Sequence, residues 1–109
     1  SIYGIYEDDF RGSTIKAAVY VVFGPRVEMV IAKDNQVKLY RLVQDEFEYI
    51  KDIKMKQQGY INSPGSTRQC WYQSHIKLIE SMFEDGYKLN YSGGMVPDLH
   101  HILLRGGGL

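Results

Sequence analysis

The sequence predicts an α+β fold, an α/β sandwich in which a mostly antiparallel or mixed sheet carries two packed helices. Two observations support this prediction. In the first half, short apolar or alternating segments follow one another between tight turn signals, as antiparallel strands do. Beyond about residue 73 the apolar residues recur with the period of amphipathic helices, and this happens twice.

The predicted strands begin at Ile2–Tyr6, which the polar loop Glu7–Ser13 separates from Ala17–Phe23. The second of these strands is continuously apolar, which is typical of a strand covered on both faces. We therefore expect it to be central in the sheet.

A meander is expected to follow. Val27–Ala32 and Val37–Val43 flank Asp34 and Asn35, two residues that tolerate the positive φ angles of a tight hairpin turn. Gln44 and Asp45 make the next tight connection, and the alternation around Phe47 and Tyr49 indicates a strand with one wet face. We expect strand structure to continue over Lys51–Asn62.

Two helices are predicted in the second half. Ser74 is expected to cap the first, over about His75–Asp85, and Gly86 to end it in a left-handed conformation. A short strand is expected over Tyr87–Tyr91. The second helix is indicated by an apolar stripe of Met95, Leu99, Ile102 and Leu103. Pro97 is tolerated in the first turn of this helix.

Composition narrows the possible functions. The chain has 109 residues, enough for one modest domain, and its 13 Lys and Arg balance its 13 Asp and Glu. A neutral chain has no net field to draw it to nucleic acid or to an anionic membrane, so we expect neither partner. The longest apolar run is too short to span a bilayer, which favours a cytoplasmic protein. Because Ser1 is not a methionine, we expect a longer parent protein truncated at both ends.

Two segments are candidate binding elements. At the strand-to-helix junction Tyr91–Met95, Gly93 and Gly94 allow a ligand close to the backbone, and a helix amino terminus favours an anion such as phosphate. The loop from Asn62 to Arg68 carries hydroxyls, a glycine and an arginine that suit a phosphate. Both segments are also compatible with ordinary turns.

The residues themselves indicate no reaction centre. His100 and His101 are adjacent on a helix and point about 100° apart, so they cannot chelate one metal from the same face. Asp98 and His101 are expected to pair on the solvent side. We therefore assign no catalytic and no metal-binding residue in this chain.

The stretch Tyr91–His100, continued to Leu103 and to Gly106–Gly107, resembles the signature in the carboxyl half of class I fructose-1,6-bisphosphatases. The resemblance implies that residues 1–109 are a single partial domain, the substrate-binding half of a sugar-phosphatase fold. It further implies a cytoplasmic homo-oligomer, a homotetramer, that uses Mg²⁺ to hydrolyse fructose 1,6-bisphosphate to fructose 6-phosphate and phosphate in gluconeogenesis. The carboxylates that hold Mg²⁺ are expected in the remainder of the parent chain, before Ser1 and after Leu109, so the chain alone is expected to be inactive.

The resemblance also assigns site residues. Tyr91 matches a tyrosine that binds the distal phosphate, and the backbone of Gly93, Gly94 and Met95 matches a segment lying along the sugar. Asn90 stands where the family usually has an arginine that reaches phosphate across a subunit interface. In the phosphate-contacting loop, Ser66 lies between Gly65 and Arg68, two positions at which this sequence differs from many family members. Arg68 is a candidate to replace the missing arginine.

Two alternatives stay open. One is a related inositol or sugar phosphatase of the same fold, and the other is a non-enzymatic interaction module. A phosphatase fragment should expose apolar surface where the rest of its parent packs, whereas a free-standing module should not.

Overall fold

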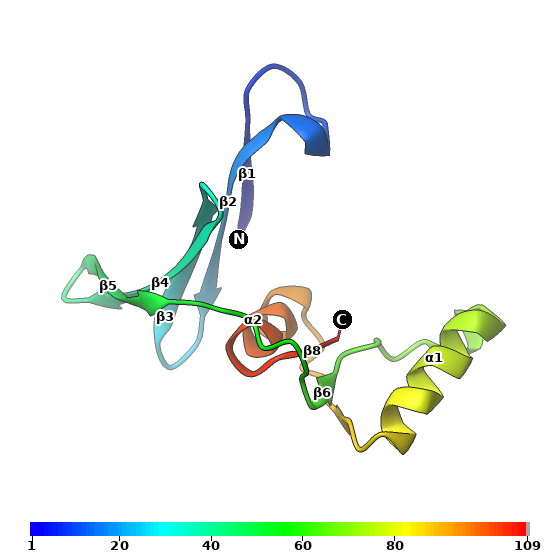
Figure 1. Cartoon of the computed structure of the whole chain (residues 1–109). Helices are drawn as coiled ribbons and strands as arrows, with labels where there is room; N and C mark the ends of the chain where they lie inside the picture. The colour runs from blue at the N-terminus through cyan, green and yellow to red at the C-terminus, as the bar shows by residue number, and fades with distance from the viewer. Residues whose placement is uncertain (109) are drawn as a thin grey trace. The chain divides into compact units, whose positions relative to one another are not determined.

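The computed structural model describes residues 1–108 and confirms the α+β class (Figure 1). It forms two compact units, unit 1 over Ser1–Lys54 and unit 2 over Met55–Leu109. The antiparallel strands all belong to a sheet in unit 1, and the parallel pairings belong to a separate sheet in unit 2. The expectation of a single partial domain over 1–109 stays a prediction, and each unit is described by itself.

Unit 1 is a five-stranded antiparallel meander with the strand order β1-β2-β3-β4-β5. A short 3₁₀ turn at Gly12–Thr14 precedes β2. The predicted strands of this half are confirmed, with bounds of β1 Ile2–Tyr6, β2 Ile15–Phe23, β3 Val27–Lys33, β4 Gln36–Val43 and β5 Glu46–Asp52.

Both predicted hairpin turns are confirmed. Asp34 and Asn35 have φ of 53° and 59°, and Gln44 and Asp45 have φ of 49° and 67°. Two consecutive residues with positive φ make a type I′ turn, whose twist matches that of the flanking strands. The turn residues thereby set the register of β3 against β4 and of β4 against β5.

The core of unit 1 is a row of cross-strand neighbours. Tyr20 lies opposite Val30, which lies opposite Leu39, and these three side chains are 7%, 2% and 2% exposed. Burial raises the pKa of Tyr20, and the Glu28 carboxylate raises it further. Apolar residues on neighbouring strands therefore bury one another along the middle of the sheet.

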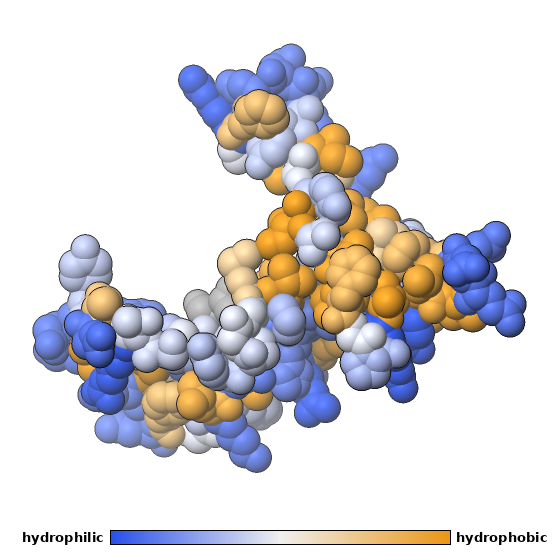
Figure 2. Space-filling model, turned by 180° about the vertical axis from the view of Figure 1, so that it is seen from behind, coloured by the Kyte–Doolittle hydropathy of each residue, from blue (hydrophilic) through white to orange (hydrophobic). Residues whose placement is uncertain are grey.

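The prediction that the second strand is covered on both faces is wrong for this unit. Strand β2 does lie between two partners, but Phe23 at its end is 72% exposed. Unit 1 is a single layer of strands without an α-helix of its own, so it cannot bury both faces. Figure 2 shows hydrophobic residues gathered over its strands, and the large exposed apolar side chains at its start are Ile2, Tyr3 and Ile5.

Unit 2 alternates strands and helices around a small parallel sheet with the order β7-β6-β8. Both predicted helices are confirmed, and Gly86 follows the first with a φ of 92°. The elements are β6 Ile61–Asn62, a 3₁₀ turn at Arg68–Cys70, α1 Gln73–Glu84, β7 Lys88–Leu89, α2 Met95–Arg105 and β8 Gly107–Gly108.

The structure corrects several boundaries. The expected strand over Lys51–Asn62 is interrupted, because β5 ends at Asp52 and only Ile61–Asn62 resumes strand pairing. Ser74 is not the cap of α1, since the Tyr72 carbonyl already accepts the first helical hydrogen bond from the Ile76 amide at 3.0 Å. The strand expected over Tyr87–Tyr91 shortens to the two residues of β7.

The predicted apolar stripe of α2 is partly wrong. Ile102 is 3% exposed, as expected, but Met95 is 60% exposed. Two polar side chains of the helix are buried as well, Asp98 and His100, which are 7% and 8% exposed. Buried polar side chains normally have hydrogen-bond partners, so the buried polar residues of this helix indicate a network of hydrogen bonds around it.

Gly59 enables the close approach of β8 to the loop before β6. A Cβ atom built on Gly59 would overlap the backbone of Gly106 and Gly107. Glycine is therefore the one residue type that this crossing accommodates without movement of the backbone.

We predict that Gly59→Ala destabilises unit 2 by about 1–3 kcal/mol, the usual cost of overpacking. The matched control is Gly12→Ala, because a Cβ on Gly12 meets no atom within 4 Å. Chemical denaturation of both variants measures the free energy of unfolding. Equal stability of the two variants would contradict the predicted contact.

We also predict that Gln44→Asn stabilises unit 1 by up to about 1 kcal/mol, because asparagine tolerates the left-handed conformation better than glutamine. The control is Gln36→Asn, the same change at the first residue of β4. Asparagine is disfavoured in strands, so the control should be neutral or slightly destabilising. A loss of stability in Gln44→Asn would argue against the type I′ turn.

Candidate functional site

The candidate site lies where two neighbouring strands of unit 2 end. Parallel pairing of β6 with β7 places Asn62 beside Leu89, and the Asn90 amide donates to the Asn62 carbonyl at 2.8 Å. The loops that leave these strands therefore start at the same edge of the sheet. The carboxyl edge of a parallel sheet is the usual place for a ligand.

One cavity of about 280 Å³ joins these two loops. Its lining includes five of the residues expected from the sequence, and the hydroxyl of Tyr91 lies 3.4 Å from that of Ser66 beside it. The structure therefore brings the two candidate segments together. The lining residues are Ser63, Pro64, Gly65, Tyr91, Gly93, Gly94, Met95 and Asp98.

Two glycines shape the cavity. Gly65 and Gly93 have φ of 88° and 86°, the left-handed region that other residues rarely adopt. A Cβ at either position would meet no atom within 4 Å, so the constraint is the backbone conformation and not space. Both loops thus expose main chain to the cavity.

Helix α2 begins at this cavity. Gly94 is its N-cap residue, and the amide of Gly94 donates to the Ser92 hydroxyl at 3.2 Å. The Ser92 hydroxyl in turn donates to the Gly94 carbonyl at 3.1 Å. The Gly94 amide is thus bonded to Ser92 and is not free to bind an anion, although Gly94 itself lines the cavity as expected. The positive end of the helix dipole still lies at the cavity.

Asp98 turns back from the first turn of α2 into the wall of the cavity. One of its carboxylate oxygens accepts from the Ser92 amide at 3.0 Å and from the Asn90 side-chain nitrogen at 3.2 Å. The expected pairing of Asp98 with His101 on the solvent side is wrong. Asp98 is buried because the chain entering the helix offers it donors, and a carboxylate in the first turn also favours the helix dipole.

Asn90 joins the segments around Asp98. Its amide nitrogen also donates to the Ser63 hydroxyl at 2.8 Å, and its amide oxygen lies 2.8 Å from Nδ1 of His101. Sequence reasoning singled out Asn90 but missed Ser63 as its partner and placed Asp98 and His101 elsewhere. The available signal was an aspartate at a helix start, four residues after a Gly-Gly pair.

Arg68 does not line this cavity. Its guanidinium forms an ion pair with Glu80 of α1, and both side chains are largely exposed. Arg68 borders a separate, mainly apolar hollow together with Trp71 and Ile79. Ser66 lines that hollow too, and Gly65 lines both the hollow and the candidate cavity, so Arg68 is set apart only in the sense that it does not line the candidate cavity itself.

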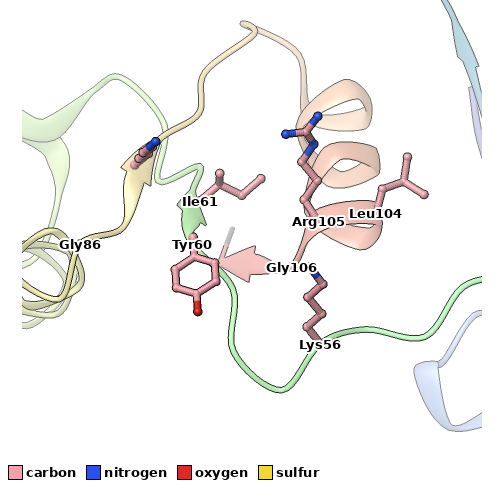
Figure 3. Close-up of a pocket in the computed structure, with 8 residues that line it drawn as sticks. Lys56, Tyr60, Ile61, Gly86, Leu104, Arg105 and Gly106 are labelled. Carbon is pink, nitrogen blue, oxygen red and sulfur yellow. The ribbon is translucent and has the colours of Figure 1, made fainter.

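A second cavity of about 650 Å³ lies at the opposite edge of the same sheet (Figure 3). The carboxyl ends of both helices lie beside it, since Gly86 shortly after α1 and Gly106 directly after α2 line the cavity. Helix carboxyl ends carry partial negative charge and attract cations, which accounts for Lys56, Lys88 and Arg105 in its lining. We therefore do not regard this larger cavity as the candidate anion site.

Neither metal ligation nor a membrane span emerges from the described part of the chain. Within residues 1–108, no three His, Cys, Asp or Glu side chains lie close enough together to hold a metal ion. None of the helices described is long and apolar enough to cross a membrane.

Comparison with known families identifies unit 2. Residues 54–109, just over half of the chain, match the model of the fructose-1,6-bisphosphatase C-terminal domain. The match begins at the boundary between the two units.

Whole-chain relatives agree. The class 1 fructose-1,6-bisphosphatases of Campylobacter hominis and Campylobacter concisus are 46% and 47% identical over 110 and 112 residues. That of Campylobacter jejuni (serotype O:23/36) is 49% identical over 110 residues. Each alignment covers all of this chain, which spans 39% of the length of these relatives.

A solved structure agrees as well. The putative sedoheptulose-1,7 bisphosphatase of Toxoplasma gondii is 28% identical and has a TM-score of 0.78, with coverage of 89% of this chain and 35% of that one. The chain therefore belongs to the class 1 fructose-1,6-bisphosphatase family, and its second compact unit corresponds to the family's C-terminal domain.

Proposed function

We propose that this chain is the sugar-phosphate-binding part of a magnesium-dependent fructose-1,6-bisphosphatase. The full-length enzyme would hydrolyse fructose 1,6-bisphosphate to fructose 6-phosphate and phosphate in gluconeogenesis. The observation that carries the proposal is the cavity between Gly65 and Gly93, at the carboxyl edge of the parallel sheet and the start of α2. Such an edge favours a bound phosphate.

The cavity suits the phosphate that does not react. Tyr91 and Ser66 offer hydroxyl donors, and the exposed main chain of Gly93 and Met95 would lie along the sugar. No carboxylate cluster is available to hold a metal within the described residues. In this proposal, the reaction at the 1-phosphate and the Mg²⁺ that it requires belong to other parts of the full-length protein.

The cavity needs a cation from outside its own lining, because no lysine or arginine is among its lining residues in the described chain. Arg68 is one candidate. An exposed pair such as Arg68–Glu80 is worth only about 0–1 kcal/mol, so a phosphate dianion would compete well for the arginine. A cationic residue from the remainder of the protein is the other candidate.

Assembly and location follow from the same assignment. We infer a cytoplasmic homotetramer that contains the remainder of the parent chain. Fructose 1,6-bisphosphate is preferred over inositol phosphates, because the curated relatives are named fructose-1,6-bisphosphatases. Sedoheptulose 1,7-bisphosphate is the second candidate substrate, favoured by the name of the structural relative.

We predict that the full-length protein releases phosphate from fructose 1,6-bisphosphate in the presence of Mg²⁺. Phosphate release should stop when a chelator is added. Residues 1–109 alone should show no such activity. A phosphate-release assay with sedoheptulose 1,7-bisphosphate and inositol 1-phosphate as parallel substrates measures specificity. Chelator-sensitive turnover by the isolated chain, or preference for the inositol phosphate, would contradict the proposal.

We predict further that Tyr91→Phe in the full-length protein raises KM for fructose 1,6-bisphosphate about tenfold, since a hydrogen bond to a charged group is worth about 1.5–3 kcal/mol. The turnover number should change little, because the contact is made before and during reaction alike. The matched control is Tyr72→Phe, whose side chain is 84% exposed and lies outside the cavity lining. Equal KM values for the two variants would show that Tyr91 does not contact the substrate.

A further inference from the structure

We propose that Asn90 is a positioning residue of the phosphate cavity and does not contact the substrate itself. The inference rests on the proposed function, because it concerns how the same cavity holds a sugar phosphate. Its basis is that Asn90 lies behind the cavity wall and bonds to residues that form that wall.

The side chain of Asn90 reaches three residues on two other segments of the chain. Its side chain donates to Ser63 in the loop after β6 and to Asp98 in the first turn of α2, and both partners line the cavity. The third contact is with His101, further along α2. Neither Asn90 nor His101 is among the lining residues. One carboxamide thus ties both loops to the helix from behind.

The chemistry of the partners determines the orientation of this amide. An ionised carboxylate only accepts hydrogen bonds, so the NH₂ group of Asn90 must face Asp98. The oxygen must then face His101, which donates from Nδ1 across 2.8 Å. All polar atoms of the carboxamide are used within the protein, and none is left over for a phosphate contact in this arrangement.

Asparagine suits this position in a way that arginine does not. The amide supplies two donors and an acceptor, whereas arginine has five donors and no acceptor. An arginine at position 90 would face the His101 donor with another donor and would release Ser63 from its short bond. A residue that touches phosphate directly would instead bind more tightly as arginine. The two roles therefore predict opposite signs for the same substitution.

The test is performed in the full-length protein with three variants, Asn90→Arg, Asn90→Ala and His101→Ala. We expect both Asn90 variants to raise KM for fructose 1,6-bisphosphate about tenfold, which corresponds to the loss of one or two net hydrogen bonds. His101→Ala should raise KM about threefold, a smaller rise because one of the three bonds is lost. The turnover number should stay within about twofold, because the groups that react lie elsewhere.

A double variant separates positioning from contact. If Asn90 acts through its partners, Asn90→Ala in the His101→Ala background should cost less than it does alone. The exposed Gln73→Ala, in the first turn of α1, is the control and should leave KM unchanged. Labelled-histidine NMR of the substrate-free protein should show His101 protonated on Nδ1, and Asn90→Ala should abolish that preference.

Three results would overturn the inference. They are a lower KM in Asn90→Arg, multiplicative effects in the double variant, and an unchanged KM in a folded His101→Ala protein. Thermal melting verifies folding, and if the Asn90 variants do not fold, the His101→Ala result decides. A wild-type protein without activity on fructose 1,6-bisphosphate overturns the proposed function together with this inference, whereas an active wild type with unaffected variants overturns this inference alone.

Discussion

The parallel pairing of β6 with β7 is the constraint on which the site depends. Each strand has two residues, and hydrogen bonds at the two ends of the pair link the Lys88 amide to the Tyr60 carbonyl and the Asn90 amide to the Asn62 carbonyl. Short strands are weak by themselves, so packing of α2 and the close crossing at Gly59 must hold them. Because the pairing aligns the strand ends, it delivers the two candidate loops to one cavity.

Burial of the Asp98 carboxyl beside this cavity is sustainable because the Ser92 amide and the Asn90 side chain both donate hydrogen bonds to it. A buried carboxylate without partners is costly, while one that accepts two hydrogen bonds at a helix start is stabilised. The same logic explains why the buried face of α2 is polar near its start and apolar near Ile102. A polar wall behind the candidate cavity holds the main chain of its loops in place without adding a cation.

The sequence predicted what local periodicity and turn chemistry determine. Strand order in unit 1 followed from tight turns such as Asp34–Asn35, and the helices followed from apolar spacing. It could not predict β8, because Gly107 and Gly108 have no strand propensity and pair only because β6 accepts them. Nor could it predict the inward turn of Asp98, which depends on donors that tertiary packing brings together. The sequence singled out both candidate loops, but it did not indicate the place of Arg68 beside Glu80.

Exposed apolar surface separates the remaining interpretations of the chain. Phe23 and Tyr3 in unit 1 are 72% and 58% exposed, and a single layer of strands offers nothing of its own to cover them. Soluble monomers rarely leave such residues grouped in the open. A chain that spans 39% of the length of its relatives accounts for this exposure, because the remainder of such a protein can cover these residues. The apolar strands of unit 1 thus favour the same origin as the family match of unit 2, part of a larger bisphosphatase.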